Sequence, residues 1–226
     1  MIKLNSSDIS HYNDNGWVKL NCGLSSEQTQ KYTDHVKLII KKAKINKYKF
    51  GRIYFDYLFD YNLAAVEAPL NRSICGSDVI NFFSELKIGS AINSLMGWKN
   101  SICSLIRLFC MGQYNYSGHW HQDNVNAGKT VQVSIILKDE KGFKIVKKNS
   151  KKKILNEEIT NKISQNFTKF KLPVTLNEKY YDVIDAKKGD VILFEPYLLH
   201  KGSYNNSRLQ FHMRFEEKKL NENKKF

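Results

Sequence analysis

The period of the apolar residues changes near residue 101, and this change constrains the fold more than any other feature of the sequence. Before it, apolar side chains recur at helical spacing. After it, they alternate or run in short blocks bounded by turn residues, which is typical of strands. Six strands are predicted, at residues 101–110, 131–137, 143–146, 181–185, 191–194 and 208–215. Helices in a block before strands favour an α+β fold in which helices support a sandwich or barrel.

The first hundred residues are predicted to be mainly helical. Helices are expected at 6–12, 25–44, 76–86 and 91–95, with a strand at 17–20. Ser6-Ser7-Asp8 and Gly76-Ser77-Asp78 supply N-terminal caps, and Asp14-Asn15-Gly16 ends the first helix. Residues 52–68 are rich in aromatic side chains, and their secondary structure stays open.

Length and composition fit one domain. The chain has 226 residues, of which 42% are hydrophobic, and this is enough to bury a full core. We expect one domain over 1–226, with 1–100 as mainly helical support, 101–215 as a β-sandwich core with an insertion at about 147–180, and 216–226 as a basic tail. The Lys-rich stretch 147–171 is interpreted as a solvated loop and helix, in preference to a lid over a site.

The chain is strongly basic, with a formal net charge of +14. Such an excess can serve an anionic partner, such as nucleic acid, a membrane surface or a charged small substrate. Because Lys, Asn and Ile dominate and Arg is scarce, the excess is better explained by the codon bias of an AT-rich genome. Each arginine therefore merits inspection, since its planar fork matches a carboxylate.

Cysteine usage and the N-terminus bear on the cellular setting. The four cysteines form no CxxC pair and no small-framework spacing, which disfavours a disulfide scaffold or a zinc finger. Residues 1–6 lack the apolar core of a signal peptide, and no apolar run reaches the roughly 18 residues of a membrane span. We therefore expect a soluble, reduced, cytoplasmic protein that does not contact membranes.

The segment 118–124 holds the strongest chemical signal. It places His119, His121 and Asp123 at alternating positions, so in a strand these side chains share one face. Imidazole nitrogens with a carboxylate oxygen suit divalent iron. A further ligand is expected from His200, which follows the apolar strand at 191–194. Two histidines and one carboxylate would form the facial triad of non-haem iron oxygenases.

A later strand carries polar side chains on one face, and they belong with this site. Alternation places four residues together, Arg208, Gln210, His212 and Arg214. A guanidinium that enters a barrel needs a carboxylate partner, and a bound ligand can supply it. His212 is interpreted as a hydrogen-bonded strand histidine in preference to a substrate contact.

Three core segments, in the same order, resemble the phytanoyl-CoA dioxygenase family of iron(II)- and 2-oxoglutarate-dependent oxygenases. Trp120-His121-Gln122-Asp123 resembles the family's WHQD signature, 131–143 resembles its second core segment, and 189–208 its GD…H…S…N.S…R segment. Residues 6–20 also resemble the family's N-terminal helix and strand. The resemblance implies a double-stranded β-helix, that is, a jelly-roll, cupin-like core buttressed by N-terminal helices.

The resemblance also implies the roles of individual residues. The catalytic metal ligands for Fe(II) would be His121, Asp123 and His200, and the distal carboxylate of 2-oxoglutarate would pair with Arg208. Three further residues are candidates for the co-substrate pocket, namely Ser203, Gln132 and Arg107. The family's Pro-Gly-Ser-His turn is replaced by Lys148-Asn149-Ser150-Lys151, and the interval from His200 to Arg208 is shorter than is common in the family.

The implied activity is a dioxygenase that uses O2 and 2-oxoglutarate to hydroxylate a small organic substrate, with release of succinate and CO2. Small substrates with anionic groups fit the basic charge. Asp123 favours hydroxylation over halogenation, because related halogenases resemble this pattern with a small residue at that position.

Alternatives remain open at three points. By geometry alone, His119 could be the metal ligand in place of His121, as in the HxH motif of cupins. That motif, however, has a glutamate a few residues later, and 125–129 contains none. The basic runs 147–153 and 218–225 leave a nucleic-acid- or anion-binding protein as the second hypothesis for function, although no nucleic-acid motif accompanies them. A catalytically silent member of the fold is the third. The sequence leaves the oligomeric state open.

Overall fold

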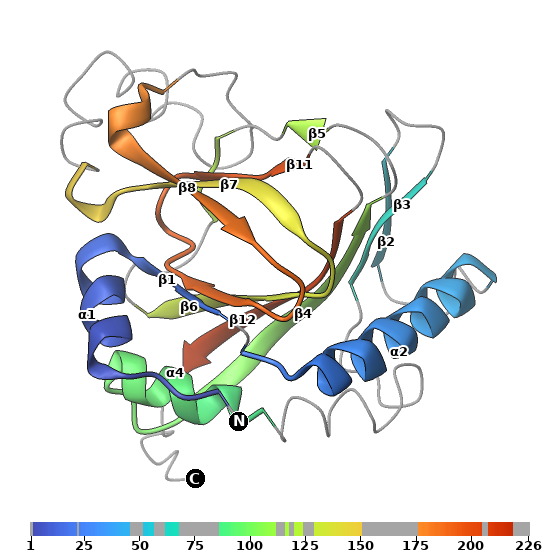
Figure 1. Ribbon diagram of the computed structural model, residues 1–226, viewed down its shortest axis with the longest axis horizontal. Helices are drawn as coiled ribbons and strands as arrows, with labels where there is room; N and C mark the ends of the chain where they lie inside the picture. The colour runs from blue at the N-terminus through green and yellow to red at the C-terminus, as the bar shows by residue number, and fades with distance from the viewer. Residues whose placement is uncertain are drawn as a thin grey trace, which may run out of the picture.

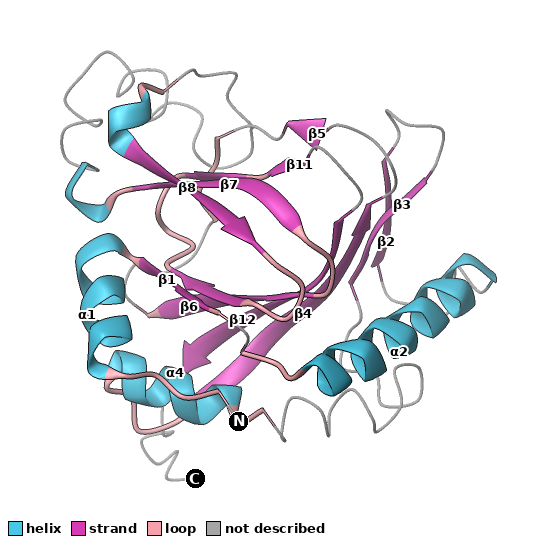
Figure 2. Ribbon diagram, viewed as in Figure 1, coloured by secondary structure: helices cyan, strands magenta, loops and turns pink. Residues whose placement is uncertain are grey.

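The structure, a computed structural model, describes residues 2–21, 23–45, 52–56, 62–67, 86–111, 116–117, 120–123, 129–150, 176–204 and 208–218. The described helices are α1 (Ser6–Asn15), α2 (Ser26–Ile45) and α4 (Ile88–Met96), with the short 3-10 helices η2 (Lys148–Ser150) and η3 (Glu178–Tyr180). Figure 2 distinguishes the helices (cyan) from the strands (magenta). The predicted helix at 76–86 falls almost wholly outside the described residues, as do most of the predicted insertion and tail.

Local sequence explains the helix ends. Asn5 caps α1 through a capping box, because its side chain accepts from the Asp8 backbone N–H while the Asp8 carboxylate accepts from the Asn5 N–H. The cap is therefore Asn5, one residue before the predicted Ser6-Ser7-Asp8. Gly16 ends the helix with a φ of 78°, a left-handed conformation that favours glycine. Ser25 and Gln28 exchange the same pair of bonds at the start of α2.

A seven-stranded sheet forms the larger layer. Its strand order is β1-β9-β6-β12-β4-β3-β2, and the pairs are antiparallel. The strands are β1 (Trp17–Leu20), β2 (Arg52–Asp56), β3 (Asn62–Glu67), β4 (Ser101–Met111), β6 (Thr130–Ile136), β9 (Val191–Phe194) and β12 (Arg208–Glu217). The undecided segment 52–68 thus supplies a hairpin that extends the sheet beyond β4.

The smaller layer lies across from this sheet (Figure 1). It consists of β7 (Glu140–Val146), β8 (Tyr181–Ala186) and β10 (His200–Lys201) in the order β10-β7-β8, with β5 (Tyr116–Ser117) paired to β11 (Ser203–Tyr204). An isolated bridge between His121 and His200 joins the segment 120–123 to β10. All six predicted strands are present, with ends that differ by at most three residues.

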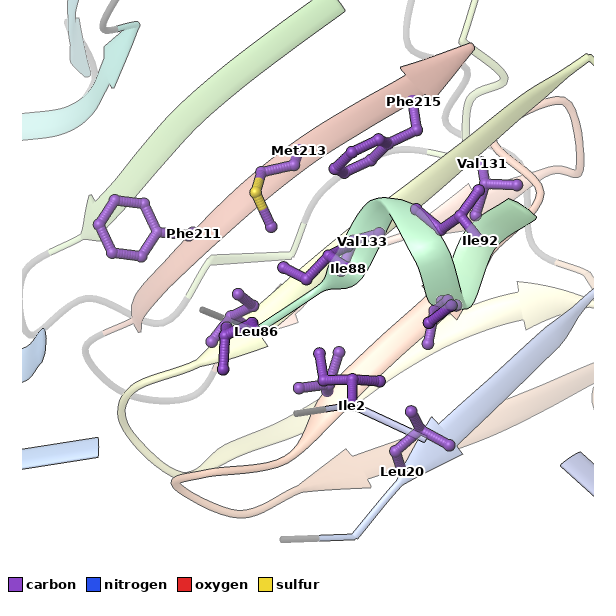
Figure 3. Close-up of a cluster of buried hydrophobic side chains, with 14 of the residues drawn as sticks. Ile2, Leu20, Leu86, Ile88, Ile92, Val131, Val133, Phe211, Met213 and Phe215 are labelled. Atoms are coloured by element: carbon purple, nitrogen blue, oxygen red, sulfur yellow. The ribbon is translucent and has the colours of Figure 1, made fainter. Parts of the chain in front are cut away.

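Strand alternation gives the large sheet two different faces. Odd-numbered residues of β6 and β12 pack against α1, α2 and α4, and Figure 3 shows part of this core, including Val131, Val133, Phe211, Met213 and Phe215. Figure 1 shows the three helices on the side of the sheet away from β7 and β8. Each fully buried side chain of this kind stabilises the fold by about 1.5–3 kcal/mol. The helices therefore hold the sheet from outside and leave its other face for the site.

The space between the two sheets has its own apolar core. Its buried members come from both layers, namely Ile136, Phe143, Ile145, Ile184, Ala186, Ile192, Phe194 and Leu198. Even-numbered residues of β12 face this space, where Arg208, Gln210 and His212 are buried. Among the described residues, no helix is both long enough and apolar enough to cross a membrane.

Tyr12 provides a test of the packing between α1 and the sheet. Its side chain is 3% exposed, and its hydroxyl has no hydrogen-bond partner among the described residues. Burial, with the nearby Glu195 charge, raises the pKa of this phenol. We expect Tyr12→Phe to leave the free energy of unfolding unchanged or to raise it by up to about 1 kcal/mol, because an unpaired buried hydroxyl costs free energy. Urea denaturation of Tyr12→Ala is the contrast, with an expected loss of about 3–5 kcal/mol.

Candidate metal centre

Three predicted ligands come together between the sheets. One ligand atom from each of His121, Asp123 and His200 lies within 4.8 Å of the others. Backbone pairing brings them together, since His121 N donates to His200 O at 3.0 Å and His200 N donates to His121 O at 2.9 Å. Asp123 N donates to Pro196 O at 2.9 Å, which fixes the segment beyond the bridge. Main-chain hydrogen bonds thus join residues that are about 80 apart in the sequence.

His200 is held with one ring nitrogen toward the backbone. Its Nδ1 lies 2.9 Å from the Leu198 carbonyl oxygen, and a carbonyl can only accept, so Nδ1 carries the proton. Nε2 is then the unprotonated nitrogen that a metal can bind. Burial, followed by the nearby His121, lowers the pKa of His200 to about 4. The ring therefore stays neutral, as a ligand must, well below neutral pH.

Asp123 is oriented by a salt bridge. Nη2 of Arg214 lies 2.7 Å from Asp123 Oδ2, a short charge-assisted contact. Nε of the same guanidinium donates to Gln132 Oε1 at 3.3 Å, and Gln132 is only 2% exposed. Arg214 and Gln132 are also register partners on β12 and β6. Gln132 thus holds Arg214, and Arg214 holds Oδ2 of the Asp123 carboxylate.

Arg208 lies in a second buried ion pair. Its Nε is 3.6 Å from Glu140 Oε2, and the two side chains are 9% and 6% exposed. The guanidinium carbon lies 4.2 Å from the centre of the Phe109 ring, at cation–π distance. The Gln210 amide, with its oxygen turned toward Arg208, accepts from Nε and Nη2. The sequence suggested a ligand as the carboxylate partner of Arg208, whereas the structure shows one within the protein.

Aromatic rings pack against the histidines of the site. The Phe194 ring lies 5.2 Å from His200 and 5.9 Å from His212 between ring centres, and Phe143 lies 6.1 Å from His200. His212 Nδ1 also lies 3.4 Å from Ser134 Oγ. This contact agrees with the interpretation of His212 as a hydrogen-bonded strand histidine.

The other predicted pocket residues are placed only by their backbones. Ser203 pairs with Ser117 between β11 and β5, and Arg107 pairs with His212 between β4 and β12. The side chains of Ser203 and Arg107, and the whole of His119, lie outside what the structure describes. Gln132 accepts a hydrogen bond from Arg214, which in turn contacts Asp123. The sequence prediction assigned no role to Arg214 or Glu140, although strand alternation did place Arg214 on the correct face.

The donor set fits a divalent iron. Two imidazoles and one carboxylate form a mixed nitrogen and oxygen set, and three protein ligands would leave further positions for other ligands. Supporting hydrogen bonds to His200 and Asp123 are those expected around metal ligands. The residues present could therefore hold Fe(II).

The lowered pKa of His200 predicts a dependence of stability on pH in the metal-free protein. An unfolded chain binds a proton to histidine near pH 6.5, whereas folded His200 does so only near pH 4. Stability is therefore fully present above about pH 6.5 and falls as the pH drops toward 4, by on the order of 3 kcal/mol. Urea denaturation from pH 7 to 4.5 would measure this, and His200→Gln should flatten the profile. An equal slope in both proteins would contradict the assignment.

Comparisons with known proteins bear on the fold. The sequence matches no protein-family model and no curated protein. Among solved structures, AviO1 from Streptomyces viridochromogenes Tue57 matches with a TM-score of 0.67 at 13% identity, over 96% of each chain. EctD from S. alaskensis, solved with 2-oxoglutarate and 5-hydroxyectoine, matches with a TM-score of 0.69 at 10% identity, over 94% of this chain and 76% of EctD.

A third match is SnoK, a non-heme alpha ketoglutarate dependent carbocyclase from nogalamycin biosynthesis. Its TM-score is 0.68 at 11% identity, over 95% of this chain and 85% of SnoK. EctD has also been solved with bound Fe. At such low identity these likenesses establish the fold and not the reaction. The prediction of an α+β fold is confirmed: the chain shares the jelly-roll, cupin-like core of these structures, supported by helices.

Proposed function

We propose that the chain is an iron(II)- and 2-oxoglutarate-dependent dioxygenase that hydroxylates a small organic substrate. The observation that carries the proposal is the convergence of His121, Asp123 and His200 within 4.8 Å between the sheets. Proteins of the same fold bind the corresponding groups, since EctD has been solved with Fe and with 2-oxoglutarate. The residue pattern, the fold and the geometry all favour the same chemistry.

In this proposal His121, Asp123 and His200 hold Fe(II), and Arg208 binds the distal carboxylate of 2-oxoglutarate. Together iron and 2-oxoglutarate supply oxidation of a C–H bond by O2, coupled to decarboxylation to succinate and CO2. The protein's own part is to bind and orient these groups. Arg214 keeps the Asp123 carboxylate in place, with Gln132 behind it. Ser203 and Arg107 stay candidates for the co-substrate pocket.

Burial of His200 supports the same role. His200 is 5% exposed, and Phe143 and Phe194 cover its ring within the apolar core between the sheets. Such an environment excludes water from one side of the metal position and strengthens electrostatic contacts there. It also keeps the imidazole neutral and so ready to bind a metal.

The finer assignments belong to the proposal as well. The WHQD segment and its two companion segments support membership of the phytanoyl-CoA dioxygenase family. Asp123 supports hydroxylation, although SnoK shows that the fold also serves a carbocyclase. We take the basic residues as a solvated surface rather than a nucleic-acid site, and the cysteine pattern as that of a reduced cytoplasmic protein.

Succinate formation tests the proposal directly. The purified chain, supplied with Fe(II), 2-oxoglutarate and O2, should release succinate slowly even without its substrate, and omission of iron or of O2 should stop it. His200→Ala, which removes a ligand, is the matched protein control, with succinate expected at background. The proposal fails if the wild-type chain neither binds Fe(II) nor forms succinate above that control.

A further inference from the structure

We infer that Glu140 is a specificity-determining residue of the co-substrate pocket: its carboxylate occupies the Arg208 guanidinium that the distal carboxylate of 2-oxoglutarate requires, and it takes up one proton when that carboxylate binds. This inference rests on the proposed function. It assigns the acidic residue a role that neither the metal ligands nor Arg208 explains.

The position of Glu140 makes it a partner of Arg208 across the interior. Glu140 begins β7 in the smaller layer, and Arg208 begins β12 in the larger one, so their ion pair spans the space between the sheets. Glu140 is 7% exposed. The distance of 3.6 Å from Arg208 Nε is an ion-pair contact, too long for a hydrogen bond.

Glu140 Oε2 is fully buried beside Arg208. With the Gln210 amide oxygen turned toward Arg208, the amide nitrogen faces acceptors, and a hydrogen bond from Gln210 acts to lower the pKa of the Glu140 carboxyl. A buried carboxylate keeps its charge only with such partners. The Glu140 carboxylate therefore already occupies the guanidinium proposed to bind the co-substrate.

Charge balance gives the consequence of this arrangement. Arg208 with ionised Glu140 is neutral, so a second carboxylate would leave one net negative charge in a buried site. Like charges at such a site raise the proton affinity of one of them. Glu140 is the group that gains the proton from solvent, and as a neutral carboxyl it can donate a hydrogen bond to the incoming carboxylate.

The surroundings of Glu140 support protonation there. Burial raises the pKa of its carboxyl, and the Arg208 charge opposes the rise. On β8 its register partner is Ala186, which carries no charge. The adjacent Asp139 accepts from the Lys188 backbone N–H at the exposed turn, and Lys141 is exposed. Arg208 is thus the charged side chain that faces Glu140 among the described residues.

Binding of two probes to the Fe(II)-loaded chain tests the inference. 2-Oxoglutarate and 2-oxopentanoate share the 2-oxo acid end, but only 2-oxoglutarate has a distal carboxylate. Under anaerobic conditions at pH 8, calorimetry should show that Glu140→Gln binds 2-oxoglutarate about tenfold more tightly than wild type, an effect of one repelling charge. Affinity for 2-oxopentanoate should be unchanged, because that probe brings no second carboxylate to Arg208.

Wild-type protein alone provides a second measurement, which does not depend on the folding of Glu140→Gln. Calorimetry in buffers of different ionisation enthalpy should show uptake of about one proton with 2-oxoglutarate and none with 2-oxopentanoate. Equal proton uptake for the two probes, or equal 2-oxoglutarate affinity in folded Glu140→Gln and wild type, overturns the role of Glu140 and leaves the proposed function standing. No binding of 2-oxoglutarate to iron-loaded wild type overturns both.

Discussion

Substitution of His200 by alanine is expected to lower the affinity of the chain for Fe(II) by at least about 100-fold. The change removes one of the three ligand side chains, and loss of a ligand exceeds the 10- to 100-fold effects measured for residues that only support ligands. It also removes the ring that the contact between Nδ1 and the Leu198 carbonyl holds in place, with Nε2 left for the metal. Anaerobic titration with Fe(II), followed by the fluorescence of the tryptophans or by calorimetry, measures the affinity.

His212 offers a matched control for this experiment. Both histidines are buried, at 5% and 8% exposure, and both rings pack against Phe194. Only His200 lies with His121 and Asp123. His212→Ala should therefore cost similar packing but keep Fe(II) affinity within a few-fold of wild type. A comparable loss of affinity in both variants would show that packing, and not ligation, was the cause.

Arg214→Gln is expected to lower Fe(II) affinity by about 10- to 100-fold, the range typical of a residue that orients a metal ligand. The 2.7 Å contact to Asp123 Oδ2 disappears, so the carboxylate can rotate away from the position it needs. Arg214 is a positioning residue, because it acts through Asp123. The same anaerobic titration applies, with thermal unfolding of the metal-free protein as a check on the fold.

Arg214→Lys separates charge from geometry. A lysine keeps the positive charge near Asp123 but lacks the fork that reaches Gln132 and Asp123 together. Its Fe(II) affinity should fall between those of Arg214→Gln and wild type, and Gln132→Ala should have the smallest effect of the three. If Arg214→Lys equals wild type, the charge alone suffices, and the fork has no role in orienting Asp123.

Much of the fold could be predicted from local patterns. Strands such as β6 and β9 are short segments rich in β-branched residues between turn residues, and this composition favours a strand over a helix. The ligand pair His121 and Asp123 was visible because period two is a local property of a strand. His200 was found through the turn and strand that precede it, together with the family resemblance.

What escaped prediction depends on the pairing of distant strands. Arg214 meets Gln132 because β12 and β6 pair in one register, and no local pattern defines that register. Glu140 and Arg208 meet across two sheets, so neither sequence neighbourhood identifies the other. The hairpin of β2 and β3 was missed for another reason: aromatic residues stand at both odd and even positions there, which hides the alternation.

Substitutions on the two faces of β12 should affect different properties of the protein. Phe211, Met213 and Phe215 belong to the core beneath the helices, while the intervening His212 and Arg214 lie on the opposite face, where Arg214 contacts Asp123. Adjacent codons thus control different properties. A library confined to the even positions would vary the chemistry on a constant support, and one confined to the odd positions would vary stability with the site's side chains intact. A single-residue deletion within the strand would exchange the two faces and destroy both at once.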